Sequence, residues 1–256
     1  TDDIDNLTTA QIAAITSTGV LGLSTDEVVA LVTAQIASLS TAQVSALTSL
    51  QVAAIATNDI SSLTTAQVAG LTSVQLGAIT TDQIGAMATL QLSSIQTADV
   101  GGLITAQIAG LTTAQLASLG TAQIATLNSN QVGAIETNDI GSLTATQAAR
   151  ITSTGLLGLG TYQIGALVTA QLAGLSTVQI GALTSVQIAA IETNDISALT
   201  TAQIVSLNSV QIGVITTDQI GAMGTLQVAS IATDDLTGLK TAQIVALSAT
   251  QIAAVT

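Results

Sequence analysis

Residues 7–14 read LTTAQIAA, and the octads that follow from Ile15, Leu23 and Leu31 read ITSTGVLG, LSTDEVVA and LVTAQIAS. The same phrase continues without insertion or deletion through the 256-residue chain, a length equal to 32 octads. Position 1 is aliphatic, position 3 is almost always Thr or Ser, position 5 is mostly Gln, position 6 is Ile, Val or Leu, and positions 7 and 8 are mostly small. This self-similarity predicts a repeat solenoid, because a single octad has too small an apolar face to fold without neighbours.

A longer period lies above the octad. ITSTGVLGL at Ile15 returns as ITSTGLLGL at Ile151, and TNDIS at Thr57 returns at Thr193. Each shift is 136 residues, or 17 octads, so we expect one continuous array over residues 1–256 with a duplicated block, for example 15–150 and 151–256. Solenoids carry capping segments where they stop, and none is visible here. We therefore interpret the chain as an in-register segment of a longer protein.

The composition is apolar and acidic, with almost no aromatic residues. Hydrophobic residues make up 48% of the chain, yet Phe, Trp, Pro, Cys and His are absent and Tyr162 is the only aromatic residue. Fifteen acidic residues face only Arg150 and Lys240, which gives a net charge of −13. This balance argues against nucleic acid and against anionic membrane surfaces, which are bound through Lys and Arg. Because Thr and Gln recur every eight residues, we expect no segment that inserts into a membrane.

The octad favours short helices. Ser or Thr at position 3 precedes the apolar residues and is expected to be the N-cap. Where position 2 is also Ser or Thr, the phrase T-x-x-Q fits a capping box in which Gln reaches back. Positions 6 and 1 are three residues apart and share one helical face, and small residues at positions 7 and 8 allow backbones to approach closely. The prediction is an all-α solenoid of one-and-a-half-turn helices, with positions 1 and 6 inside and positions 2 and 4 outside.

A β-solenoid is the alternative fold. Thr, Ile and Val favour strands, and the lack of Pro suits continuous β-ladders. Against it, the apolar spacing is alternately five and three residues instead of two. Ala and Gln, which fill many other positions, prefer helices. The sequence favours the all-α solenoid and leaves the β-solenoid open.

Aspartate replaces glutamine at position 5 in spaced octads. The spacing of these octads, and of those with Ile at position 1, fits 17 octads in seven turns, or about 2.4 octads and 19 residues per turn, with one acidic stripe. Carboxylates on such a stripe are candidate Ca²⁺ ligands, but Ca²⁺ needs six to eight oxygens and the GGxGxD motif is absent. We favour aspartates that serve the first helical turn on a solvated stripe, and expect no cofactor. The candidate Ca²⁺ ligands are Asp59, Asp99, Asp139, Asp195 and Asp235.

Catalysis is not expected, because the chain has no His or Cys and no nucleophile–base pair can be assembled from its Ser and Thr residues. We therefore predict neither a catalytic site nor a small-molecule substrate. Large apolar residues at position 4 are unusual on a solvated face and predict lateral packing between copies of the chain. These residues are Leu50, Val74, Leu90, Val178, Val186, Val210 and Leu226.

The octad pattern L-[ST]-x-x-Q-[ILV]-x-x-L resembles the octapeptide arrays of giant secreted and surface proteins of bacteria. This resemblance implies the repetitive shaft of a bacterial fibre or adhesin, extracellular or on the cell surface, that associates with copies of itself laterally or end to end. LTTAQIAAIT from Leu7 also resembles the LTPEQVVAI opening of the DNA-reading repeats of plant-pathogen effectors. The proline, the longer period and the positive charge of those repeats are missing, so no DNA binding is implied.

An alternative function from another class is a ligand-binding solenoid, which would bind ice or a glycan along its regular Thr face. Separately, the octad from Leu143 departs most from the consensus. Ala148 stands there at position 6, which is otherwise a larger aliphatic residue. We expect a local weak point with a cavity beside Ala148.

Overall fold

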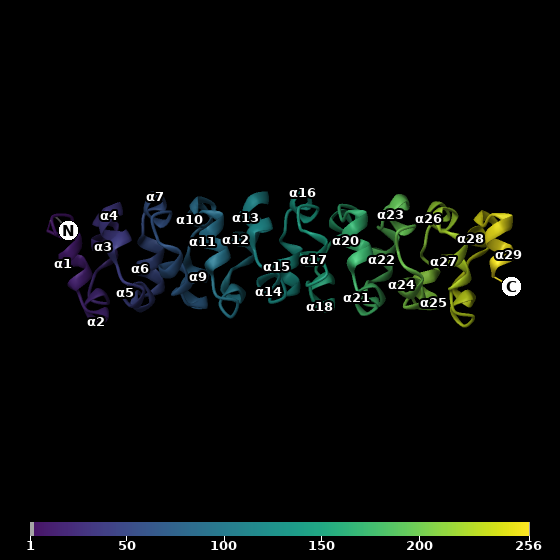
Figure 1. Ribbon diagram of the computed structural model, residues 1–256, viewed down its shortest axis with the longest axis horizontal. Helices are drawn as coiled ribbons and strands as arrows, with labels where there is room; N and C mark the ends of the chain where they lie inside the picture. Colours follow the sequence, from purple (N-terminus) through teal and green to yellow (C-terminus); the bar gives the residue numbers. More distant parts are fainter. Residues whose placement is uncertain (1–2, 256) are drawn as a thin grey trace. The chain divides into compact units, whose positions relative to one another are not determined.

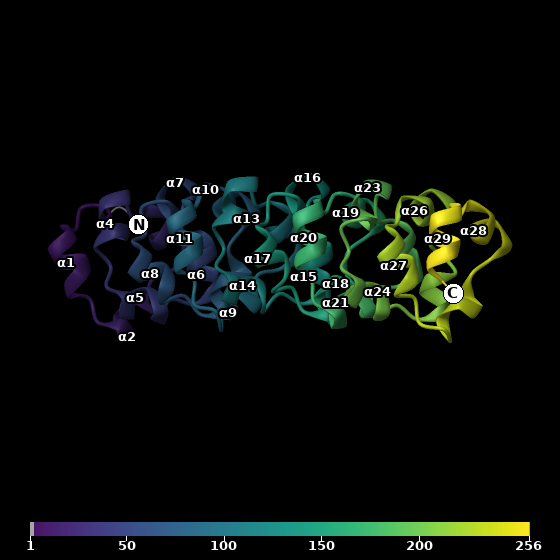
Figure 2. The ribbon, with the colours of Figure 1, turned by 45° about the vertical axis from the view of Figure 1, so that its right-hand side comes forward.

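The computed structural model describes residues 3–255, and every regular element in that range is a helix (Figures 1 and 2). The all-α solenoid is therefore confirmed and the β-solenoid is wrong. The chain divides into two compact units, Thr1–Leu127 and Asn128–Thr256. In each unit, successive short helices wind into a superhelix. Among the described helices, none combines the length and apolarity needed to cross a membrane.

Unit 1 contains α1 (Thr9–Ala14), α2 (Ser17–Val20), α3 (Thr25–Ala30), α4 (Thr33–Ser38), α5 (Thr41–Ala46), α6 (Ser49–Ala54), α7 (Thr57–Ile60), α8 (Thr65–Ala69), α9 (Ser73–Ala78), α10 (Thr81–Ala86), α11 (Thr89–Ser94), the 3₁₀ helix η1 (Val100–Gly102), α12 (Thr105–Ala109), α13 (Thr113–Ser118) and α14 (Thr121–Ile124). Unit 2 contains α15 (Ser129–Gly133), α16 (Thr137–Ile140), α17 (Ala145–Ala148), α18 (Ser153–Leu156), α19 (Thr161–Gly165), α20 (Thr169–Gly174), α21 (Thr177–Ala182), α22 (Ser185–Ala189), α23 (Thr193–Ile196), α24 (Thr201–Val205), α25 (Ser209–Ile212), α26 (Thr217–Ala222), α27 (Thr225–Ala229), the 3₁₀ helix η2 (Asp235–Gly238), α28 (Thr241–Ala246) and α29 (Ala249–Ala254).

The N-cap of a typical helix is position 2, one residue before the position that the sequence suggested. Thr8 accepts a hydrogen bond from the Gln11 N–H at 3.3 Å, and its own N–H donates to Gln11 Oε1 at 2.8 Å. The predicted capping box is thus confirmed. The prediction that position 3 is the N-cap is wrong, because residues such as Thr9 are already the first residue of the helix.

The corner between helices is made by two residues in extended conformation. After α1, Ile15 has ψ 133° and Thr16 has ψ 158°, and the next helix then begins. No residue among 3–255 has a positive φ. A turn built in this way needs neither glycine nor asparagine at a fixed place, so position 1 is free to carry a large aliphatic side chain.

Positions 1 and 6 form the core, as predicted, and positions 2 and 4 face outward. Side chains such as Ile60, Leu63, Ile180 and Leu183 are buried at these inner positions. Exceptions occur in the first and last described turns, where Ile244 and Ile252 are half exposed. The interior is therefore two rows of aliphatic side chains that wind along each unit.

Consecutive turns stack helices that are three octads apart. In unit 1, α1 packs on α4 and α7 on α10, and in unit 2, α15 packs on α18. Hydrogen bonds between turns join residues 28 and 31 positions apart, such as Gln43 with Ile15 and Ile12. Since 28/8 is 3.5, one turn takes about 3.5 octads. The predicted 2.4 octads per turn is wrong: 17 octads also fit five turns of 3.4 octads, and the spacing of isoleucines and aspartates does not distinguish the two solutions.

Glutamine at position 5 is buried and bonds each turn to the preceding one. The Gln171 Oε1 accepts from the Val168 N–H at 2.8 Å, and its Nε2 donates to the carbonyls of Ile140 at 2.9 Å and Leu143 at 2.6 Å. Short helices leave their last four carbonyls without intrahelical partners, and the glutamine amide satisfies two of these at the end of the octad below. We call this repeated arrangement the glutamine ladder.

Paired glycines mark the closest approach between turns. In unit 2, a methyl group on Gly158 would lie 1.9 Å from the Ser129 carbonyl oxygen, and one on Gly133 would lie 2.6 Å from the Gly158 oxygen. Gly77 and Gly102 form a corresponding pair between α9 and η1 in unit 1. The expectation that small residues at positions 7 and 8 bring backbones together is confirmed.

Candidate interaction surface

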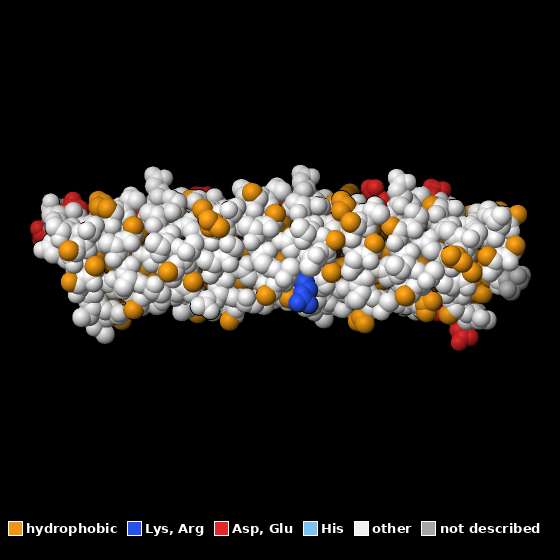
Figure 3. All heavy atoms as spheres, in the orientation of Figure 1, with side chains coloured by type: hydrophobic (Ala, Val, Ile, Leu, Met, Phe, Trp, Pro, Cys, Tyr) orange, Lys and Arg blue, Asp and Glu red, His pale blue; other side chains and the backbone are white. Residues whose placement is uncertain are grey.

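The large apolar residues at position 4 are exposed, as the sequence predicted. Tyr162, Val186 and Val210 expose 84%, 65% and 66% of their surface from α19, α22 and α25. These three helices stack on consecutive turns, since α22 packs on both α19 and α25. Because they occupy the same octad position, Tyr162, Val186 and Val210 form one slanting apolar row, which we call the second-unit stripe. Figure 3 shows apolar side chains scattered among polar atoms on one face of the molecule.

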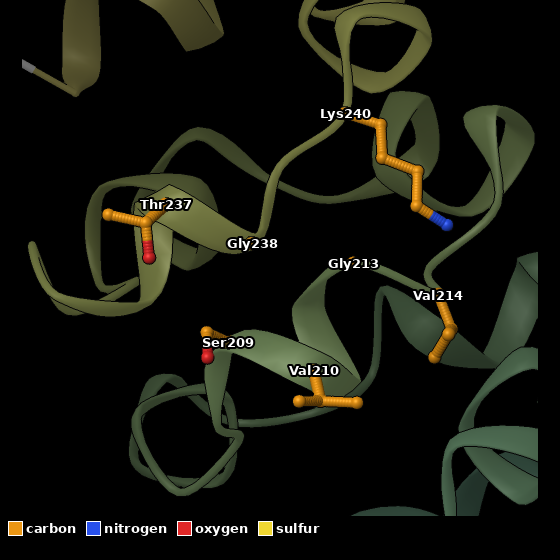
Figure 4. A pocket seen from close by; sticks show the side chains of 7 residues that line it. All are labelled: Ser209, Val210, Gly213, Val214, Thr237, Gly238 and Lys240. Atoms are coloured by element: carbon orange, nitrogen blue, oxygen red, sulfur yellow. The ribbon is translucent and has the colours of Figure 1, made fainter.

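A small pocket of about 330 Å³ lies where the second-unit stripe reaches η2. It is lined by Val210 and Val214, by Gly213, Gly238, Ser209 and Thr237, and by Lys240. Figure 4 shows Val210 on α25, with the Lys240 side chain across the opening beside Val214. Lys240 is the only lysine of the chain, so this end of the stripe places a cation next to exposed apolar atoms.

Unit 1 carries a corresponding row, which we call the first-unit stripe. Leu50 on α6 and Val74 on α9 are exposed by 74% and 70%, and α9 packs directly on α6. They stand 136 residues before Val186 and Val210. On the turn below Leu50, α3 presents the exposed Asp26 at the same octad position. The first-unit stripe therefore ends in a carboxylate where the second-unit stripe ends in an ammonium group.

The aspartates at position 5 bond to the preceding turn. Asp59 accepts from the Thr33 hydroxyl, and Asp195 accepts from the Thr169 hydroxyl. Asp99 Oδ1 accepts from the Ser73 N–H at 2.8 Å. Each carboxylate thus lies at the N-terminus of a helix three octads earlier, where the helix dipole favours an anion. The predicted solvated position is wrong: Asp59 and Asp99 are half-buried and Asp195 is buried.

A single acidic stripe is also wrong. Asp59 and Asp99 are 40 residues apart, which at 28 residues per turn is about 1.4 turns and places them on different sides of unit 1. In unit 2, Asp139 and Asp195 are 56 residues or two turns apart and share a side, as α16 and α23 do in Figure 1. Asp235, at the start of η2, lies 40 residues beyond Asp195 and faces elsewhere.

The structure brings none of the five candidate Ca²⁺ ligands together. Within residues 3–255, no cluster of three or more acidic or other metal-ligating side chains is present. The hydrogen bonds of Asp59, Asp99 and Asp195 give these carboxylates a role in packing between turns. Calcium binding at Asp59, Asp99, Asp139, Asp195 or Asp235 stays a hypothesis that calorimetric titration tests.

Glu27 is the one glutamate at position 5. Its carboxylate accepts from the Ser24 N–H at 2.8 Å and from the Ser24 hydroxyl at 2.9 Å. These two bonds, the backbone bond first, hold the pKa of Glu27 below its ordinary value of 4.5. Glu27 thus makes the N-terminal half of the capping arrangement, and a carboxylate has no hydrogen to donate to a carbonyl on another turn.

The Thr and Ser hydroxyls at position 3 are outside the capping bonds. Thr65 and Thr201, for example, are exposed first residues of α8 and α24, while the hydroxyls of Thr64 and Thr200 receive the capping N–H groups. The argument that position-3 hydroxyls are occupied as caps is therefore wrong. Some of them bond to aspartates instead, as Thr33 and Thr169 do.

A comparison with protein families finds one matching description, the ALTTAQ repeat. It matches seven stretches that together cover most of the chain, namely residues 1–33, 28–57, 52–89, 92–129, 164–190, 188–225 and 228–256. No curated protein matches the sequence. The repeat described by the family is the octad whose caps, ladder and exposed position 4 are given above.

Proposed function

The chain belongs to the ALTTAQ repeat family, and we propose that it is a structural protein, the repetitive shaft of a bacterial fibre or adhesin that associates with copies of itself. In this proposal it works outside the cell or on its surface, without catalytic activity. The resemblance of its octads to the arrays of giant bacterial surface proteins supports that location.

The glutamine ladder is the observation that carries the proposal. In both units, buried glutamines such as Gln43 and Gln171 bond each turn to carbonyls of the turn before it. Each turn therefore depends on its neighbours and on nothing distant, as in other solenoids. Addition or loss of octads changes the length of such a protein without a change of fold, which suits a spacer or shaft.

The exposed apolar residues at position 4 support the self-association. Leu90, Val178 and Leu226 are each more than two-thirds exposed, in addition to the residues of the two stripes. Rows of large aliphatic side chains on a surface are typical of faces that become buried in an assembly.

Electron microscopy and sedimentation velocity of the purified chain, over a range of concentrations, test this proposal. We expect elongated particles that form bundles or filaments as concentration rises. Discrete monomers at every concentration would contradict the self-association. Antibody labelling of intact cells tests the location, and a signal seen only after the cells are lysed would argue against an extracellular shaft.

The second candidate is a ligand-binding solenoid that uses its Thr face. It is supported by the position-3 hydroxyls, which are exposed and outside the capping bonds at residues such as Thr65 and Thr201. Measurements of thermal hysteresis and of retention on glycan arrays test it. Hysteresis or retention by a chain that remains monomeric would place this function ahead of the shaft.

A further inference from the structure

We propose that the second-unit stripe of one copy binds the first-unit stripe of a second copy in antiparallel orientation, with Lys240 facing Asp26. This inference names the surface for the self-association proposed above and rests on that proposal. It commits to one occupant, a second copy of this chain, and to one pairing of its residues.

The two stripes match in spacing. Val186 and Val210 stand at position 4 of stacked helices one turn apart, and so do Leu50 and Val74. Packed helices lie about 8–10 Å apart, so both pairs have the same separation along the axis. In an antiparallel arrangement Val210 lies opposite Leu50, and Val186 lies opposite Val74. All four side chains are at least 65% exposed, so each has apolar surface to bury.

The charges at the two ends select the partner and the direction. Lys240 lines the pocket beside Val210, at the far end of the second-unit stripe. The exposed Asp26 lies one turn before Leu50, at the near end of the first-unit stripe. Only the antiparallel arrangement brings these two ends to the same level. In a chain with net charge −13, a surface whose nearest charge is a lysine is complementary to another copy of the chain itself.

The contact joins two different surfaces and is therefore heterologous. Each chain carries one stripe in each unit, so a bound copy still has an unused stripe for the next copy. Heterologous contacts of this kind generate rings or open filaments. The apolar pairs bury surface in the centre, while the Lys240–Asp26 pair at the rim fixes orientation more than it adds affinity.

Cysteine cross-linking tests the pairing directly, because the chain has no cysteine of its own. A Val210→Cys chain is mixed with a Leu50→Cys chain under mild oxidation. We expect a disulfide-linked heterodimer. The matched control replaces Val210→Cys by Val245→Cys, which puts the thiol at an equally exposed valine outside the stripe and should give little product. Linkage of Val210→Cys mainly to Val74→Cys, or to itself, would overturn the antiparallel pairing.

A charge exchange gives a second readout. Lys240→Asp alone should raise the dissociation constant of the assembly by at least about tenfold, and Asp26→Lys alone should do the same. The chain that carries both substitutions should assemble again, provided that circular dichroism shows all three variants to be folded. Failure of the double variant to recover would overturn the proposed contact.

The failure of this inference is distinguishable from failure of the proposed function. If the natural chain assembles but Lys240→Asp, Asp26→Lys and the cross-linking pairs have no effect, the stripes are not the surface and the shaft proposal stands. If the natural chain remains monomeric at every concentration, both proposals are wrong. Val245→Asp serves as the control for an exposed charge elsewhere and should assemble like the natural chain.

Discussion

Glutamine at position 5 makes a set of bonds that neither glutamate nor an aliphatic residue makes. Gln171 has none of its surface exposed, accepts one bond through Oε1 and donates two through Nε2. A carboxylate keeps the acceptor and loses the donors, while a methionine loses both. The amide therefore explains why this polar residue recurs in an otherwise aliphatic interior.

Gln171→Glu should lower the free energy of unfolding by about 2–4 kcal/mol, because it buries a carboxylate against two carbonyl oxygens. Urea denaturation measures this change. The matched control is Gln11→Glu, which has the same capping bond to Thr8 at an exposed site and should change stability little. Equal effects at the two sites would mean that the bonds to the preceding turn contribute nothing to stability.

Ala148→Ile should raise the melting temperature. Ala148 has 1% of its surface exposed and stands at position 6, where the neighbouring octads carry Ile140 and Leu156. A larger aliphatic side chain that fills space there contributes about 1–2 kcal/mol. Calorimetry checks this, with Ala170→Ile at an exposed site of the same unit as the control. An unchanged or lower melting temperature would show that the site has closed around the alanine.

At the scale of the element, the sequence predicted the kind of helix better than its start. The periodicity of positions 6 and 1 and the phrase T-x-x-Q were enough to predict short capped helices with an aliphatic interior. Position 3 was assigned as the N-cap because it is Thr or Ser more uniformly than position 2, yet Thr8 caps α1 and Thr9 is its first residue. The deciding factor is that Gln11 at the third helical position must reach the N-cap, which fixes the cap three residues before it.

What joins one helix to the next turn was beyond the sequence. The aspartates looked like a solvated stripe, because their partners Thr33 and Thr169 are 26 residues earlier, a separation that is meaningful only once the number of octads per turn is known. The ladder was missed for the same reason. The signal was present in the uniformity of Gln at position 5, since a cap alone would also accept Glu, as at Glu27.

Gly158→Ala tests the close approach of α15 and α18. The added methyl group would lie 1.9 Å from the Ser129 carbonyl oxygen, so the two turns must separate and the protein should lose more than about 2 kcal/mol. Gly85→Ala in α10 is the control, because nothing lies within 4 Å of its added carbon. There the better helix propensity of alanine should add about 0.5–1 kcal/mol. Chemical denaturation of both variants measures the contrast, and similar values would contradict the glycine pairing.

At the scale of the whole molecule, the ladder is uniform while the glycine pairs and aspartates are placed at particular turns. Every consensus octad offers a glutamine and the carbonyls that another glutamine needs. The pairs Gly77–Gly102 and Ser73–Asp99, by contrast, depend on separations of 25 and 26 residues. A change in octad number therefore preserves the ladder but separates those pairs.

Deletion of residues 79–86 should therefore lower the melting temperature while the far-ultraviolet circular dichroism remains helical. This deletion removes one octad between Ser73 and Asp99 and between Gly77 and Gly102. Deletion of residues 63–70 also removes one octad but lies between neither pair, and should be tolerated better. Equal melting temperatures for the two deletions would show that the placed pairs add nothing to the uniform ladder.

The direction of the ladder has a consequence for how the protein is made. Glutamines such as Gln43, Gln75 and Gln203 donate to carbonyls 28 and 31 residues closer to the N-terminus. A ribosome delivers the acceptors of each octad before it delivers the donor, so a nascent chain completes one turn after another without waiting for distant sequence. A series of stalled chains of increasing length should gain protease resistance one turn at a time, instead of all at once at full length. An unfinished chain would then already be a shorter version of the finished protein.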